Sequence, residues 1–194
     1  MCIRDSTMRN NEAMDLLWVG KFDFRKQLGL ALKVMAELKE YPKIHLNVLG
    51  AGHDEENLFY RQMADRLGVS GAVTFHGKMV HDHVLDMMRK ADLFFFTSIL
   101  DETSTVILEA LGCLLPVVCF DACGFGPVIT PDVGRRIPFS NPDASVKDFK
   151  RAILELYSQP ELLKRMSANC VGKCETLTWG YKAEQMMKLY KKVV

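Results

Sequence analysis

Residues 93–120 read LFFFTSILDETSTVILEALGCLLPVVCF, and this stretch decides the fold. Its two apolar runs, at 93–97 and 116–120, are short, as is typical of strands that are buried on both faces. Between them, the residues from about 104 to 114 predict a buried helix. A strand, a helix and a second strand in this order are typical of a parallel sheet with a helical crossover.

The same alternation continues on both sides of this stretch. Short apolar runs predict strands at 16–19, 44–49, 72–75 and 134–138, and helical spacing predicts helices at 26–40, 54–67, 81–90, 143–157, 160–177 and 179–192. These units predict an α/β, Rossmann-like, doubly wound fold in which a mostly parallel sheet has helices on both faces. Ligands of such sheets bind beyond the carboxyl ends of the strands, so the loops that follow the strands form the candidate site.

Composition excludes several classes of protein. The 194 residues are 48% hydrophobic and 25% charged, which suits one globular domain with a sizeable core. The formal net charge of +1 is not a basic excess, so nucleic acid is not an expected partner. No apolar run approaches the ~18 residues of a membrane span. The six cysteines lack the tight pairs and the histidine neighbours of a zinc site, so we expect reduced thiols and no metal.

Asp101 and Glu109 are the acids that bear on function in the central stretch. An acid within a buried helix must reach water or find a polar partner, and a ligand with hydroxyls, such as a sugar or a ribose, is one such partner. The alternative for Asp101 is a helix-capping role. The alternatives for Glu109 are a carboxylate that reaches solvent and a buried salt bridge.

The loop after the first strand is rich in cations. Gly20 is followed by Lys21, Arg25 and Lys26, which come just before or within the first turn of the expected helix. Cations oppose the helix dipole at this end, so their presence is better explained if an anion such as phosphate binds there. The two lysines would also neutralise Asp101, which makes the two loops a set. The alternative is a solvated basic loop.

Together these residues resemble the donor-binding domain of the retaining glycosyltransferases of family 4, which have the GT-B fold. Members carry an acid, then seven residues, then Glu-Ala; here Asp101 and Glu109 have this offset, 109 − 101 = 8, with Asp in place of the usual Glu. Members also carry Gly-Arg, with a lysine six residues after the glycine. Gly20, Lys21 and Lys26 occupy these three positions.

The resemblance implies a role for each loop. Lys21 and Lys26 would bind the donor diphosphate. Asp101 would contact hydroxyls of the donor sugar and Glu109 the donor ribose, which makes these four the expected catalytic residues. Met79 and Val80 would pack along the nucleobase, and the alternative for this pair is ordinary turn and core packing. Further donor contacts are expected from nine residues near the strand ends, which are Gly20, Arg25, Gly50, Gly52, Met79, Val80, Thr103, Ser104 and Thr105.

The implied reaction is transfer of a sugar from a UDP- or GDP-sugar with retention, without a metal or other cofactor. The chain would be one half of a GT-B enzyme, with a non-native leader or residual linker at 1–13, a nucleotide-sugar-binding domain at 14–178 and a crossover helix at 179–194. A missing N-terminal domain would bind a glycan or lipid-linked acceptor. We expect the full enzyme in the cytoplasm, with peripheral association at the inner face of the membrane as a further option.

Two alternatives stay open at this point. One is another GT-B enzyme, such as a nucleotide-sugar epimerase. The other is a non-enzymatic nucleotide-binding α/β module, for example a receiver-like domain. That class needs an acidic cluster at the end of the first strand, where this chain has Gly20-Lys21.

Overall fold

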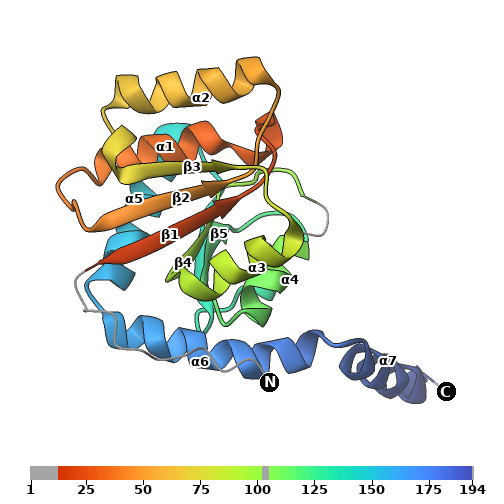
Figure 1. Ribbon diagram of the computed structural model, residues 1–194. Coiled ribbons are helices and arrows are strands. Elements are labelled where there is room, and N and C mark those ends of the chain that lie inside the picture. The colour runs from red at the N-terminus through yellow and green to blue at the C-terminus, as the bar shows by residue number, and fades with distance from the viewer. Residues whose placement is uncertain (1–12, 102–104, 194) are drawn as a thin grey trace.

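The computed structural model describes residues 13–101 and 105–193. Its six-stranded sheet consists of β1 Met14–Val19, β2 Ile44–Leu49, β3 Val73–Gly77, β4 Leu93–Phe96, β5 Val117–Phe120 and β6 Gly134–Ile137. The strands lie in the order β3-β2-β1-β4-β5-β6, and every neighbouring pair is parallel. The predicted doubly wound α/β fold is confirmed (Figure 1).

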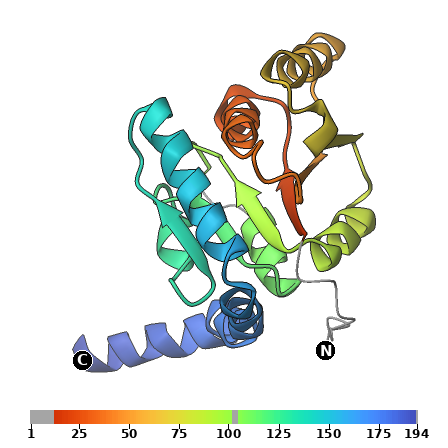
Figure 2. The same cartoon turned by 90° about the vertical axis from the view of Figure 1, so that its left-hand side faces the viewer.

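Helices cover both faces of the sheet. The helices of the described ranges are α1 Leu28–Glu37, α2 Asp54–Leu67, α3 His81–Lys90, α4 Thr105–Gly112, α5 Pro142–Tyr157, α6 Pro160–Leu177 and α7 Trp179–Val193. Three short 3-10 turns are η1 Phe24–Lys26, η2 Ser70–Ala72 and η3 Gly126–Val128. Helices α1, α2 and α5 pack on one face and α3 and α4 on the other, whereas α6 contributes to the core on both faces (Figure 2).

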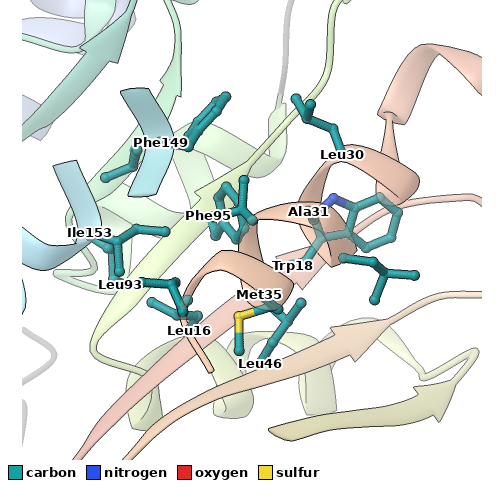
Figure 3. Packing of buried hydrophobic residues seen from close by; sticks show 14 of the residues in the cluster. Leu16, Trp18, Leu30, Ala31, Met35, Leu46, Leu93, Phe95, Phe149 and Ile153 are labelled. Atoms are coloured by element: carbon teal, nitrogen blue, oxygen red, sulfur yellow. The ribbon is translucent and has the colours of Figure 1, made fainter. Parts of the chain in front are cut away.

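The two-sided burial explains why the central strands are apolar at consecutive positions. Leu16 and Trp18 of β1 belong to the core with α1 and α5, whereas Leu17 belongs to the core of the opposite face. On β4, the ring centroid of Phe95 lies 5.3 Å from that of Phe149 of α5, within the first core (Figure 3). Because side chains alternate across a strand, a strand covered on both faces has to be apolar throughout.

The predicted helix at 26–40 is interrupted near its start. Asp23 Oδ1 accepts the backbone N–H groups of Arg25 at 3.0 Å and of Lys26 at 3.2 Å, and this closes the separate turn η1. Gln27 then takes a left-handed conformation with a φ of 52°, so α1 begins only after it. Arg25 and Lys26 therefore lie in a turn of their own rather than in the first turn of α1, and Lys21 lies in the loop before this turn. The other predicted helices and strands agree with the structure to within two residues at either end.

Helix α7 exposes several large apolar side chains. It projects beyond α6, away from the sheet (Figure 1). Trp179 is 91% exposed and Tyr190 60% exposed. None of the helices in the described ranges has both the length and the apolar character that a membrane crossing requires. The predicted boundaries at 1–13, 14–178 and 179–194 stay predictions.

The cysteines of the described ranges are all free, and three of them are buried. Burial raises the pKa of Cys119 to about 12, so this thiol stays protonated at neutral pH. It behaves as a small apolar side chain of the sheet.

Candidate functional site

The loops after β1 and β4 meet at the carboxyl edge of the sheet, where the strand order reverses. The backbone N–H of Ile99 donates to the carbonyl of Arg25 at 2.9 Å. The hydroxyl of Ser98 lies 3.1 Å from the same carbonyl oxygen. The two loops that the sequence predicts to act as a set are thus in contact. We refer to residues 20–27 and 97–101 as the β1–β4 junction.

A buried hydrogen-bond network anchors the β1–β4 junction. The indole N–H of Trp18 donates to Thr97 Oγ1 at 2.9 Å, and this hydroxyl donates to the carbonyl of Lys26, 2.8 Å away. Trp18 and Thr97 are almost completely buried, so these groups satisfy one another without help from solvent. The network connects β1 to β4 and fixes the backbone of Lys26.

Replacing Thr97 with valine is expected to destabilise the fold by about 1–3 kcal/mol, because the buried Trp18 N–H loses its acceptor while the side chain keeps its volume. Urea unfolding followed by circular dichroism measures the change. The matched control is Thr97→Ser, which keeps the hydroxyl and should lose less stability than the valine variant. An unchanged unfolding midpoint in Thr97→Val would contradict the role of the network.

Lys26 and Asp101 form an ion pair across the β1–β4 junction. Lys26 Nζ contacts Asp101 Oδ2, and the hydroxyl of Ser98 lies 3.0 Å from the same carboxylate oxygen. The two charged side chains are 18% and 21% exposed. Lys26 Nζ also lies 5.3 Å from the ring centroid of Phe96, within the range of a cation–π contact. Because an ammonium has three N–H donors, Lys26 can hold this carboxylate and a further anion.

Arg25 and Lys21 differ in their partners. The guanidinium of Arg25 pairs with Asp23 at 2.9 Å. Burial alone would raise the pKa of Asp23, but the hydrogen bonds and charge of Arg25, together with the backbone N–H groups of η1, outweigh it and hold the pKa below its usual value. Arg25 is thus neutralised by its neighbour. Within the described ranges, the exposed side chain of Lys21 has no hydrogen-bond or ion-pair partner.

Glycines bring the ends of β1, β2 and β3 together. The N–H of Gly20 donates to the carbonyl of Leu49 at 3.0 Å, and the N–H of Gly50 donates to that of Gly77 at 2.8 Å. Gly50 has a φ of 131°, and a Cβ at this position would lie 1.8 Å from the carbonyl oxygen of Gly20. Only glycine permits this approach of two neighbouring strand ends.

Gly52 has a local role that the sequence did not indicate. Asn57 of α2 accepts the N–H of Gly52 at 3.0 Å and donates to its carbonyl at 3.1 Å. A Cβ on Gly52 would lie 2.2 Å from a carboxylate oxygen of Glu56. The backbone of Gly52 is therefore hydrogen-bonded to the start of α2, and these bonds hold the loop between β2 and α2 in place.

Glu109 pairs with a residue that the sequence reasoning missed. Its Oε1 lies 3.0 Å from Nε2 of His81, the first residue of α3. Met79 packs against the core with α3 and α4, and Val80 is 65% exposed immediately before His81. The predicted nucleobase segment therefore adjoins the residue that contacts the predicted ribose acid. The position of His81 directly after this segment is the sequence signal that could have identified it as a site residue.

The remaining predicted residues follow β4. Thr103 and Ser104 lie outside the described residues, and Thr105 is the exposed first residue of α4. The loop after β5 reaches the β1–β4 junction, because Cys123 Sγ lies 3.5 Å from the carbonyl oxygen of Ile99. The described part of the chain holds no group of three or more His, Cys, Asp or Glu side chains arranged to bind a metal ion.

Comparison with known proteins bears on the family of this chain. Residues 3–170 match the model of a family described as glycosyl transferases group 1. The chain belongs to this family. The resemblance that Asp101, Glu109 and the lysines indicated is thereby confirmed at the level of the group 1 glycosyltransferases.

This group 1 chain spans less than half the length of the curated relatives that it matches. The D-inositol 3-phosphate glycosyltransferase of Rhodococcus jostii (strain RHA1) is 25% identical over 181 residues, which cover 90% of this chain and 39% of that protein. WaaG, a glycosyltransferase involved in lipopolysaccharide biosynthesis, superposes with a TM-score of 0.74 at 25% identity, over 85% of this chain and 43% of that chain. The pneumococcal O-GlcNAc transferase GtfA, in complex with UDP and GlcNAc, shares the fold with a TM-score of 0.76 at 20% identity, over 94% and 35%.

Proposed function

We propose that this chain is the donor-binding domain of a retaining glycosyltransferase that uses a nucleotide-sugar such as a UDP- or GDP-sugar. The observation that carries the proposal is the Lys26–Asp101 pair, held at the carboxyl edge of the sheet where the strand order reverses. Membership of the group 1 family supports the reaction class. The UDP complex of GtfA, which has the same fold, supports a nucleotide as the ligand.

The cations of the β1–β4 junction suit a diphosphate. Lys26 is anchored through its backbone by Thr97, and its ammonium has N–H donors beyond the one that faces Asp101. Lys21 is exposed on the same loop. The start of α4 at Thr105 adds backbone N–H groups at this edge. In this proposal the two lysines hold the diphosphate. Arg25 is paired with Asp23 and stabilises the conformation of the loop after β1.

The acids suit the hydroxyls of the donor. Lys26 and Ser98 both contact Oδ2 of Asp101. The other carboxylate oxygen, Oδ1, can then accept hydrogen bonds from the donor sugar. Glu109 is 31% exposed and accepts hydrogen bonds from the ribose in this proposal. The pattern of acids and cations therefore matches a ligand that has hydroxyls at both ends and phosphates between them.

The chemical step places negative charge on the departing nucleoside diphosphate. Lys21 and Lys26 stabilise this developing charge electrostatically, and losing one such donor commonly costs on the order of 10²–10³ in rate. In this proposal the reaction needs no metal or other cofactor. The acceptor, a glycan or a lipid-linked molecule, is bound by the part of the enzyme that is not in this chain. The full enzyme acts in the cytoplasm, with peripheral association at the inner face of the membrane.

Calorimetric titration with UDP-glucose and GDP-mannose tests the proposal. We expect weak binding of at least one donor and little transfer to added acceptors, because half of a GT-B site is absent. Absence of binding by any nucleoside diphosphate would contradict donor binding. Efficient transfer by the isolated chain would contradict its being half of an enzyme, and isomerisation of the donor sugar without acceptor, followed by NMR, would favour a nucleotide-sugar epimerase.

A further inference from the structure

His81 and Glu109 are brought together from separate helices. His81 is the first residue of α3, Glu109 lies in the second turn of α4, and Nε2 of the imidazole is 3.0 Å from Oε1 of the carboxylate. A carboxylate accepts hydrogen bonds only, so Nε2 has to carry the proton in this contact. Among the described residues, His81 is the one partner that the Glu109 side chain has. Within the part of the chain that the structure describes, His81 is therefore the residue that orients this carboxylate.

We propose that His81 is a positioning residue that presents Glu109 to the ribose and so makes the site select ribonucleotides over 2′-deoxyribonucleotides. This inference rests on the proposed function, because it takes Glu109 as the ribose acceptor. Oε1 is engaged by His81, which leaves the second oxygen of the carboxylate for the hydroxyls of the ligand.

The physical basis is preorganisation. A glutamate side chain that is free in solvent loses rotamer freedom when a ligand fixes it, and this loss weakens binding. The Glu109 side chain is 31% exposed, so it is accessible to a ligand while His81 already holds one of its oxygens. A site built to hydrogen-bond a hydroxyl rejects a ligand that lacks the hydroxyl, because the acceptor is then left without its donor.

The position of His81 also links two parts of the proposed nucleotide site. Met79 and Val80, the residues that we expect along the nucleobase, directly precede it in the chain. Val80 occupies the N-cap position of α3 with extended backbone, and His81 follows as the first helical residue. A single turn of chain therefore carries both the base contacts and the residue that orients the ribose acceptor.

The test compares UDP, GDP and ADP, each with its 2′-deoxy counterpart, by calorimetry on the wild-type chain and its variants. We expect the wild type to prefer the ribonucleotide. In His81→Ala this preference should fall on the order of 3- to 10-fold, the size of a coupling between residues in contact. His81→Gln retains a side-chain N–H donor and should restore most of the preference.

Two controls separate positioning from a general loss of structure. His83→Ala removes an exposed histidine from the same helix, and it should leave the preference unchanged. In a Glu109→Ala background, which has no side-chain acceptor, His81→Ala should have no further effect, because the residue acts through Glu109.

The outcomes distinguish this inference from the function on which it rests. If no nucleoside diphosphate binds the wild type, both the donor-binding function and the role of His81 are wrong. If nucleotides bind but ribose and deoxyribose are not distinguished, donor binding stands, whereas the roles of Glu109 and His81 at the ribose are wrong. Only the role of His81 is wrong if His81→Ala weakens both ligands equally, or if its effect adds to that of Glu109→Ala.

Discussion

Replacing Lys26 with alanine is expected to weaken the binding of UDP or GDP by about 10- to 100-fold. A charge-assisted hydrogen bond from the ammonium to a phosphate contributes about 1.5–3 kcal/mol. The substitution also leaves Asp101 without the cation that it contacts, so the carboxylate would repel the phosphates. Both effects act in the same direction, and calorimetry on the wild type and the variant measures their sum.

The matched control for this prediction is Lys33→Ala. Lys33 is an exposed lysine of α1, so its removal makes the same change in net charge away from the β1–β4 junction. We expect this variant to bind the nucleotide as the wild type does. If the two alanine variants lose affinity equally, Lys26 has no specific role and the phosphate assignment fails. Thermal unfolding of both variants shows whether either change disturbs the fold.

Replacing Gly50 with alanine is expected to destabilise the fold by about 3 kcal/mol or more. A φ of 131° is strained for any residue with a Cβ, at a cost on the order of 1–3 kcal/mol. In addition, the new Cβ would lie 1.8 Å from the carbonyl oxygen of Gly20, which forces the ends of β1 and β2 apart. Since a domain of this kind is stable by about 5–15 kcal/mol, the loss is a large share of the total.

Urea unfolding measures this change, with Gly71→Ala as its control. A Cβ on Gly71 would meet nothing within 4 Å, so that variant should stay within about 0.5 kcal/mol of the wild type. A Gly50→Ala variant as stable as the control would show that the junction of the two strands can relax without cost.

The layers of the fold were predictable because the burial of each element determines which of its sequence positions are apolar. A strand such as β4, covered on both faces, is apolar at every position, whereas a helix such as α2 alternates polar and apolar residues with helical spacing. The start of α1 was less predictable. Gln27 has an ordinary propensity for helix, but its left-handed conformation depends on local hydrogen bonds, among them one from its side chain to the Phe24 carbonyl at 2.7 Å.

The contacts of the site were only partly predictable, for a different reason. Lys26 and Asp101 are 75 residues apart, and their contact requires β1 to lie beside β4, which the lengths of the apolar runs do not specify. The pattern of lysines and acids indicated that the loops after β1 and β4 act together, but it did not specify which atoms are in contact. The contact of His81 with Glu109 depends on the packing of α3 against α4, and no local pattern shows which way an exposed residue at a helix start faces.

The two tryptophans of the chain have opposite surroundings, and this gives the protein an optical reporter of its own. Trp18 is 1% exposed and donates to Thr97 at the β1–β4 junction, whereas Trp179 is 91% exposed at the start of α7. A collisional quencher such as acrylamide reaches the exposed indole first. The emission that survives quenching therefore comes from Trp18, next to the backbone of Lys26. Intrinsic fluorescence can thus follow events at this junction without a label.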